Sequence, residues 1–301
     1  MQNVLYFNLM VKGKLRKIAN DGLAKSLKMR QEDHSLKSLS FHHQVSRLHH
    51  LFETFPDNRS RSNISKEFND AAMGAFALFF TQSPSFLAYQ KLMRESEGMD
   101  NAQNLFGVNE LLSDNHIRNL MDEVSPCLVF PFFEEIFHVL KEKYHPQLTS
   151  FRSYNNNFLL GVDGVQYYSS KKICCDSCCQ RSHVSSKGKK VTYSYHHSVV
   201  MAALVHPAKS QVISFPPEFI TPQDGNDKQD CEINASRRWL NTYGMRYMRY
   251  MRYASEGITI LGDDLYCHQP FCQHLLEQGF DFIFTCKPTS HKTLYVKKCL
   301  R

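Results

Sequence analysis

The sequence predicts two domains, an all-helical one over residues 1–150 and one with helices and a mixed sheet over residues 151–301. Two observations predict this division. Up to about residue 147, apolar residues recur at three- and four-residue spacing, which is typical of amphipathic helices. After residue 150, short runs of β-branched and aromatic residues alternate with helical segments, in the order of three strands, helix, strand, helix and strand. Such an order predicts an α/β layer with a mixed sheet.

The helical half shows its period in segments that are separated by turn-forming residues. Breaks are expected at Ser83-Pro84-Ser85, at Asp114-Asn115 and at Ser125-Pro126. The clearest helical patterns cover residues 68–80, 85–93, 109–124 and 131–144.

Each element of the second half has its own signal. The first strand is the apolar run from Phe158 to Val162, followed by extended stretches at residues 191–207 and 211–217. A helix is predicted at residues 226–243, with Asn226 or Asp227 as its N-cap. A buried strand at 257–264, a helix over 269–279 that ends on Gly279 and a strand at 280–288 complete the domain.

The composition is that of a globular chain whose charge is unevenly distributed. Of 301 residues, 42% are hydrophobic and 22% are charged, with a formal net charge of +7. Residues 1–50 hold nine Lys or Arg and three Asp or Glu, a balance of 9 − 3 = +6, and the rest is almost neutral. A basic segment indicates a polyanionic partner such as nucleic acid, although a solvated basic segment would show the same pattern.

The apolar runs at residues 4–11 and 71–80 are too short to span a membrane, so we expect a soluble, cytoplasmic chain. The ten cysteines are expected to be reduced thiols, some of them at a metal site, because no export signal precedes them.

A triple Met-Arg-Tyr repeat runs from Met245 to Tyr253. Its three-residue period matches neither a helix nor a strand. It is interpreted as a neutral duplication that lengthens a loop or a helix end, with an Arg/Tyr surface for nucleic acid as the alternative.

Two apolar runs are each followed by aspartate. Asp163 follows residues 158–162, and Asp263 and Asp264 follow the run from Ile258 to Leu261. If the first strand lies beside the fourth, these carboxylates can be neighbours, and Mg²⁺ or Mn²⁺ would relieve their repulsion. Such ions support phosphodiester cleavage. Alternatively, each aspartate only caps a turn.

A separate Cys/His cluster predicts a structural zinc site. Cys174, Cys175, Cys178 and Cys179 lie close together, and His183 follows. The predicted zinc ligands are Cys175, Cys178 and His183, with His196 or His197 completing the shell. The alternative is a run of reduced thiols on a hairpin.

Two further groups have open interpretations. The acidic set Asp224, Asp227, Asp230 and Glu232 is interpreted as a loop and a helix N-terminus, where negative charge is favourable. Lys287 and His291 either approach a DNA phosphate or only cap the last strand.

From about Ala71 to Tyr295 the chain resembles the DDE-type transposases of bacterial insertion sequences, whose catalytic core is ribonuclease-H-like. The segments that carry the resemblance are "GAFALFFTQSPSFLAYQ", "NLFGVNELLSDNHIRNLMD", "LLGVDGVQYYSS", the Cys/His cluster, "YHHSVVMAALVHP", "PPEFITPQDGNDKQDCEINASRRWL", "ITILGDDLYCHQPFC" and "FIFTCKPTSHKTLY".

The resemblance implies a function and a set of site residues. Asp163 matches the first catalytic aspartate of the family and Asp263 the second, with Asp264 as the fallback; both would bind Mg²⁺ or Mn²⁺. The third family carboxylate is a glutamate on a later helix, and this chain ends before such a helix. Glu277 and Asp281 are interpreted as structural.

The resemblance therefore implies a C-terminally truncated transposase with an incomplete ribonuclease-H-like core and low or no activity. Its helical domain would bind transposon-end DNA. The chain would act on double-stranded DNA, transposon ends and target, in the bacterial cytoplasm and nucleoid, and a homodimer on DNA is the oligomer that this function would allow. The alternative is a non-catalytic DNA-binding protein that occupies transposon ends.

Overall fold

The structure, a computed structural model, describes residues 39–57, 59, 68–184, 191–222, 230–247, 257–293 and 295. The chain divides into two compact units, one over Phe7–His145 and one that contains Pro146–Arg301. We call their described parts the helical unit and the sheet unit. Among the described residues, no helix has the length and apolar character needed to cross a membrane.

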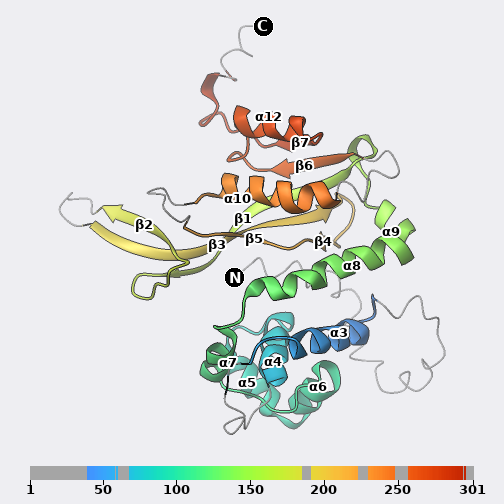
Figure 1. The fold of residues 1–301 in the computed structure, drawn as a ribbon, viewed down its shortest axis with the longest axis vertical. Coiled ribbons are helices and arrows are strands. Elements are labelled where there is room, and N and C mark those ends of the chain that lie inside the picture. The colour runs from blue at the N-terminus through green and yellow to red at the C-terminus, as the bar shows by residue number, and fades with distance from the viewer. Residues whose placement is uncertain are drawn as a thin grey trace. The chain divides into compact units, whose positions relative to one another are not determined.

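The helical unit packs around one apolar helix. In its described part it contains α3 (Phe41–Glu53), α4 (Phe68–Phe80), α5 (Phe86–Arg94), α6 (Ser96–Phe106), α7 (Asp114–Met121), the 3₁₀ turn η4 (Pro126–Val129) and α8 (Phe130–Lys143) (Figure 1). α4 contacts α3, α6 and α7, and most of its residues are buried, as expected for a helix that is apolar on nearly all sides.

Serine caps and one buried carboxylate define the ends of these helices. The Ser85 hydroxyl accepts the N–H of Ala88, which confirms a break before α5. The break predicted at Asp114 is wrong, because Ser113 caps α7 and Asp114 forms its first turn. Asp70 on α4 is buried, and its carboxylate accepts backbone N–H groups of residues 109 and 110 at 3.0 Å each.

The sheet unit contains a mixed sheet, which confirms the predicted helix-plus-sheet architecture. Its strands are β1 (Phe158–Ser170), β2 (Cys179–Val184), β3 (Val191–Val205), β4 (Ile213–Ser214), β5 (Glu218–Ile220), β6 (Ile258–Gly262) and β7 (Asp281–Phe284). The order is β2-β3-β1-β6-β7, with β4 and β5 also paired to β3. β1 is antiparallel to β3 and parallel to β6, and β6 is parallel to β7.

The first strand is longer than the sequence predicts. It continues past Val162 to Ser170 because its second half pairs with β3. That half is only partly buried, so it lacks the continuous apolar run by which the sequence predicts a strand.

Two helices pack on the sheet. α10 (Glu232–Trp239) lies against β3 and β5 and continues into a π-helical turn, Leu240–Gly244, whereas α12 (Gln269–Glu277) lies against β7 (Figure 1). Gly279 has a φ of 80° after α12, which fits the predicted glycine stop. α9 (His145–Thr149) and the 3₁₀ turn η5 (Tyr154–Asn156) precede β1.

The start of α10 differs from the predicted start of its helix. Its first residue is Glu232, because Cys231 has extended backbone angles. Asn226 and Asp227 lie outside the described residues, as does the Met-Arg-Tyr repeat beyond Tyr247.

Candidate functional site

The parallel pairing of β1 with β6 brings Asp163 and Asp263 to the same edge of the sheet. Phe158 pairs with Ile258 and Gly161 with Leu261, after which β6 ends at Gly262. Asp163 therefore lies in the part of β1 that continues beyond its pairing with β6. Asp263 is the first residue of the loop that follows β6. Both aspartates line a cavity of about 370 Å³, together with residues of β1, β3 and β6.

Burial and the charge of Asp263 both act on the Asp163 carboxyl. Desolvation raises the pKa of Asp163 above its ordinary value, and the negative charge of Asp263 raises it further, while a backbone hydrogen bond from Gly164 opposes both effects. A carboxylate whose pKa is raised by a like charge is a favourable ligand for a cation, since the cation removes the repulsion.

A third carboxylate, that of Glu232, belongs to the same group, although the sequence analysis did not assign it to the site. Its Oε1 atom accepts the backbone N–H of Gly164 at 3.1 Å. Burial raises the pKa of Glu232, and the charges of Asp163 and Asp263 add to that effect. The site therefore has carboxylates from β1, from the loop after β6 and from the first turn of α10.

Tyr266 also holds Glu232. Its side chain is 1% exposed, and its hydroxyl is hydrogen-bonded to the Glu232 carboxylate and accepts the Ser236 hydroxyl at 3.1 Å. Burial keeps the pKa of Tyr266 far above its ordinary value, so the phenol stays protonated and donates to the carboxylate. Tyr266, in the loop that begins at Asp263, thus orients Glu232.

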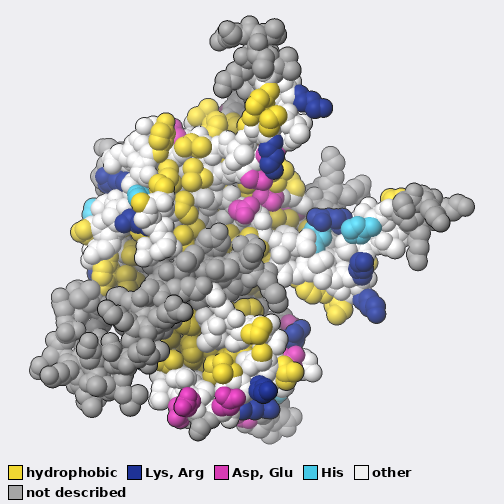
Figure 2. Space-filling view, turned by 180° about the vertical axis from the view of Figure 1, so that it is seen from behind, with side chains coloured by type: hydrophobic (Ala, Val, Ile, Leu, Met, Phe, Trp, Pro, Cys, Tyr) yellow, Lys and Arg dark blue, Asp and Glu magenta, His cyan; other side chains and the backbone are white. Residues whose placement is uncertain are grey.

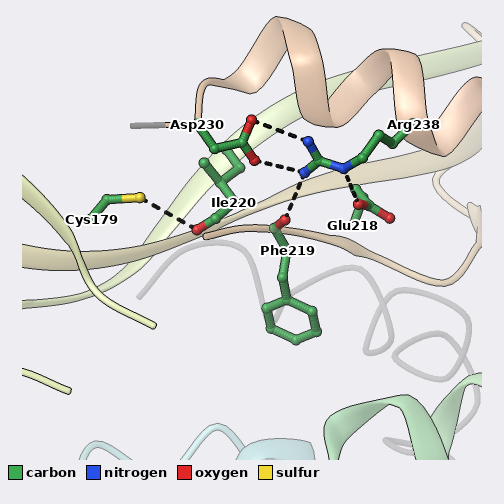
Figure 3. Close-up of polar contacts among 6 residues, drawn as sticks. All are labelled: Cys179, Glu218, Phe219, Ile220, Asp230 and Arg238. Atoms are coloured by element: carbon green, nitrogen blue, oxygen red, sulfur yellow. Dashed lines mark hydrogen bonds and ion pairs between the residues drawn. The ribbon is translucent and has the colours of Figure 1, made fainter. Parts of the chain in front are cut away.

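An ion pair fixes the start of α10, and with it the position of Glu232. Figure 3 shows Arg238 reaching from α10 to Asp230, which it binds through two nitrogens at 3.1 and 2.7 Å. The same guanidinium donates to Glu218 at 2.7 Å and to the carbonyl of Phe219 at 3.1 Å, both on β5. Because the Asp230 side chain is fully buried, this pairing is needed to keep its charge in the fold.

Asp264, the fallback in the sequence analysis, has other contacts. Its carboxylate accepts the backbone N–H of Lys287 and is hydrogen-bonded to Ser290, and these contacts hold its pKa below the ordinary value. Asp264 therefore joins the loop after β6 to the loop after β7, and Asp263 is the aspartate that lines the cavity with Asp163.

No family model, curated protein or solved structure matches this chain.

A Cys/His group that could hold a metal ion lies beside the hairpin formed by β2 and β3, with two cysteines in the loop before β2 and a histidine on β3. Cys175, Cys178 and His197 bring their ligand atoms within 4.8 Å of one another. The two Sγ atoms are 3.8 Å apart, and His197 Nε2 lies 3.2 Å from Cys175 Sγ and 2.9 Å from Cys178 Sγ. Two thiolates on one tetrahedral zinc ion are also roughly 3.8 Å apart, since Zn–S bonds are about 2.3 Å long.

The structure places His197, and not His183, beside the two thiols. Cys179 pairs with His196 in the antiparallel register, so the next residue of β3, His197, lies at the level of Cys178. His183 pairs with Thr192, further along the hairpin. His183 Nε2 contacts the Ser194 hydroxyl at 2.7 Å instead. The expected ligand His183 is corrected to His197 because the register of β2 and β3 carries His183 away from the cysteines.

The second ring nitrogen of His197 also has a polar neighbour, as is usual for a histidine that binds a metal ion. The Tyr167 hydroxyl lies 3.2 Å from His197 Nδ1, the ring nitrogen that faces away from the thiols. Such a contact fixes the ring orientation of a histidine ligand. Cys179 is not part of the group, since its thiol is buried and directed at the Ile220 carbonyl (Figure 3).

One face of the sheet unit carries an acidic patch and a basic arm. Figure 2 shows acidic side chains gathered in one patch, whereas Lys, Arg and His side chains gather on the arm formed by β2 and the outer part of β3. Exposed basic residues in this part of the sheet unit include Arg181 on β2 and Lys171 and Lys172 in the loop that leads into β2.

Proposed function

We propose that this chain is a metal-dependent enzyme that cleaves phosphodiester bonds of DNA, built on the ribonuclease-H-like core of DDE-type insertion-sequence transposases. The observation that carries the proposal is the gathering of Asp163, Asp263 and Glu232 around one end of the β1–β6 strand pair. Carboxylates that raise the pKa values of their neighbours are expected where a protein binds a cation or moves a proton.

The sheet supports the choice of fold family. A long first strand is antiparallel to the strand that follows its hairpin and parallel to the strand that carries the second aspartate. This is the neighbourhood that the resemblance requires for its two catalytic aspartates. Glu232 supplies a third carboxylate from α10, so the proposed enzyme does not depend on a glutamate from a later helix.

The donor set fits Mg²⁺ or Mn²⁺. Asp163, Asp263 and Glu232 offer only carboxylate oxygens, which these hard cations prefer, and their mutual repulsion favours a positive ion among them. When bound, such an ion supplies Lewis acidity and lowers the pKa of a coordinated water. The residues of the chain bind and orient: Gly164 and Tyr266 hold Glu232, and Arg238 fixes the helix on which Glu232 stands.

The basic arm supports DNA as the substrate. Lys171 and Lys172 in the loop before β2 and Arg181 on β2 are exposed, so they can pair with phosphates of a duplex. Transposition then consists of hydrolysis at the ends of the element and attack of the freed 3′-hydroxyl on target DNA.

Nicking of supercoiled plasmid DNA tests the proposal. The chain is expected to nick the plasmid with Mg²⁺ or Mn²⁺ and not with a chelator, and Asp163→Asn or Asp263→Asn is expected to abolish nicking while DNA binding persists. Glu277→Gln is the matched control, because Glu277 is an exposed carboxylate at the end of α12. Cleavage that persists in either aspartate variant would contradict the assignment.

The same assay distinguishes the second candidate function. A chain that binds transposon-end DNA without metal-dependent nicking would be a non-catalytic DNA-binding protein, which the basic arm alone would support.

A further inference from the structure

We propose that Cys267, Cys286 and His291 form a zinc site that joins the loops following β6 and β7. One ligand atom of each residue lies within 4.8 Å of the ligand atoms of the other two. The Cys267 and Cys286 thiols are in hydrogen-bond contact with each other. Two thiols and an imidazole form the donor set that tetrahedral zinc prefers.

The fold brings these residues together from separate turns. β6 and β7 are parallel neighbours, so the loops that follow them leave the same edge of the sheet. Cys267 lies in the turn after β6, where its N–H donates to the Asp264 carbonyl at 3.3 Å. Cys286 lies just after β7, and His291 follows in a turn where its N–H donates to the Lys287 carbonyl at 3.0 Å.

The observation that points to a ligand is the imidazole of His291. Its side chain is 10% exposed, and its Nε2 atom is buried and has no hydrogen-bond partner among the described residues. Asp264 Oδ1 lies 3.2 Å from this nitrogen, close enough for an ion pair but not in the geometry of a hydrogen bond. The buried imidazole, with one ring nitrogen within 4.8 Å of both thiol sulfurs, completes a set of two sulfur donors and one nitrogen donor that would hold a metal ion.

Asp264 lies beside the proposed zinc site and is not one of its ligands. Its carboxylate already accepts the Lys287 N–H and is hydrogen-bonded to Ser290. The protein ligands are therefore Cys267, Cys286 and His291, which leaves a fourth position for water. When Zn²⁺ binds, each thiol releases its proton to the solvent and becomes a thiolate ligand.

The position of the site indicates its role. The Thr285 N–H donates to the Gly262 carbonyl at 3.2 Å, and Asp264 contacts Lys287, so the two loops already touch at several points. A zinc ion bound by Cys267, Cys286 and His291 would add a further link between the loop that begins at Asp263 and the loop after β7. The inference concerns metal binding alone and holds whether or not the chain cleaves DNA.

Zinc analysis of the full chain tests this inference. The parent for the experiment carries Cys175→Ser and Cys178→Ser, so that the β2–β3 hairpin no longer contributes zinc. After reconstitution with Zn²⁺ and gel filtration, the parent is expected to retain about one zinc ion per chain. Adding Cys267→Ser and Cys286→Ser is expected to remove it. Cys272→Ser is the matched control, since this half-buried cysteine on α12 lies outside the group.

Cobalt titration of the same folded parent removes any dependence on the folding of the Cys267 and Cys286 variants. Co²⁺ bound to thiolates is expected to give an intense charge-transfer absorption that an equimolar amount of Zn²⁺ abolishes. A parent that retains no zinc and shows no such absorption would overturn the inference. Zinc retained in full after Cys267→Ser and Cys286→Ser would also overturn it.

Discussion

Gly164 donates its backbone N–H to Glu232 Oε1 at 3.1 Å, although the two residues are 68 positions apart in the sequence. The residue directly after Asp163 thus holds a carboxylate whose pKa is raised mainly by burial and also by the charge of Asp163. This contact depends on the missing side chain, because a Cβ atom at Gly164 would lie 2.0 Å from Glu232 Oε2.

Gly164→Ala is therefore expected to displace Glu232 while the fold is retained. The clashing atoms belong to the end of a flexible side chain, which can rotate away, and the Gly164 N–H then loses its acceptor. We expect the nicking rate to fall by about 100-fold, as for other misplaced catalytic groups. Gly74→Ala, on α4 of the helical unit, is the control, because its Cβ would meet its nearest neighbour at 3.8 Å. Equal rates for the two variants would contradict the role of Glu232.

Glu232 should also make the stability of the metal-free chain depend on pH. The pKa of this carboxyl is raised above its ordinary value of 4.5 in the fold. Its favourable contribution is therefore fully present below about pH 4.5 and is lost as the pH rises through the folded-state pKa. The unfolding free energy of Glu232→Gln minus that of the native chain is therefore expected to be larger at pH 7 than at pH 4. Urea unfolding at both pH values, in chelator, measures this; a pH-independent difference would contradict it.

Loss of the Arg238 guanidinium is expected to destabilise the sheet unit. Arg238→Met leaves the fully buried Asp230 carboxylate without its partner, which typically costs about 3 kcal/mol of unfolding free energy. Adding Asp230→Asn removes the buried charge, so the double variant is expected to recover part of this loss. Urea unfolding of both variants measures the effect, and strictly additive losses would show that the two residues do not depend on each other.

Zinc binding at the β2–β3 hairpin should depend on His197 and not on His183. In a parent that carries Cys267→Ser and Cys286→Ser, we expect His197→Ala to lower the zinc content, since His197 Nε2 contacts both thiols. His183→Ala is the matched control on the same hairpin and is expected to retain zinc. The opposite result would restore the ligand set predicted from the sequence.

The sequence could predict those features that depend on local pattern. The apolar runs before Asp163 and Asp263 predicted two buried strands, and β1 and β6 do lie side by side in a mixed sheet. The full length of β1 could not be predicted, because its outer half is held by pairing with β3 and not by an apolar run.

Features that depend on register and on long-range contacts could not be predicted. Glu232 looked like an ordinary charge at a helix N-terminus, and only the packing of α10 brings it to Gly164. His183 has a suitable spacing from the cysteines, but the pairing of β2 with β3 places His197 beside them instead. Sequence spacing therefore identified Cys175 and Cys178, and offered His197 only as one of two possible completing ligands, whereas its third ligand, His183, was wrong.

Binding of Mn²⁺ to the zinc-reconstituted chain tests the central claim most directly, namely that Asp163, Asp263 and Glu232 form one cation site. The electron paramagnetic resonance signal of free Mn²⁺ falls as the ion binds. We predict that the native chain binds Mn²⁺ saturably and that Mg²⁺ reverses this binding. Asp163→Asn, Asp263→Asn and Glu232→Gln are each expected to weaken Mn²⁺ binding at least about tenfold, the equivalent of about 1.4 kcal/mol. Glu277→Gln is expected to leave Mn²⁺ binding unchanged. Binding that is equally strong in the native chain and in the three carboxylate variants would contradict the claim.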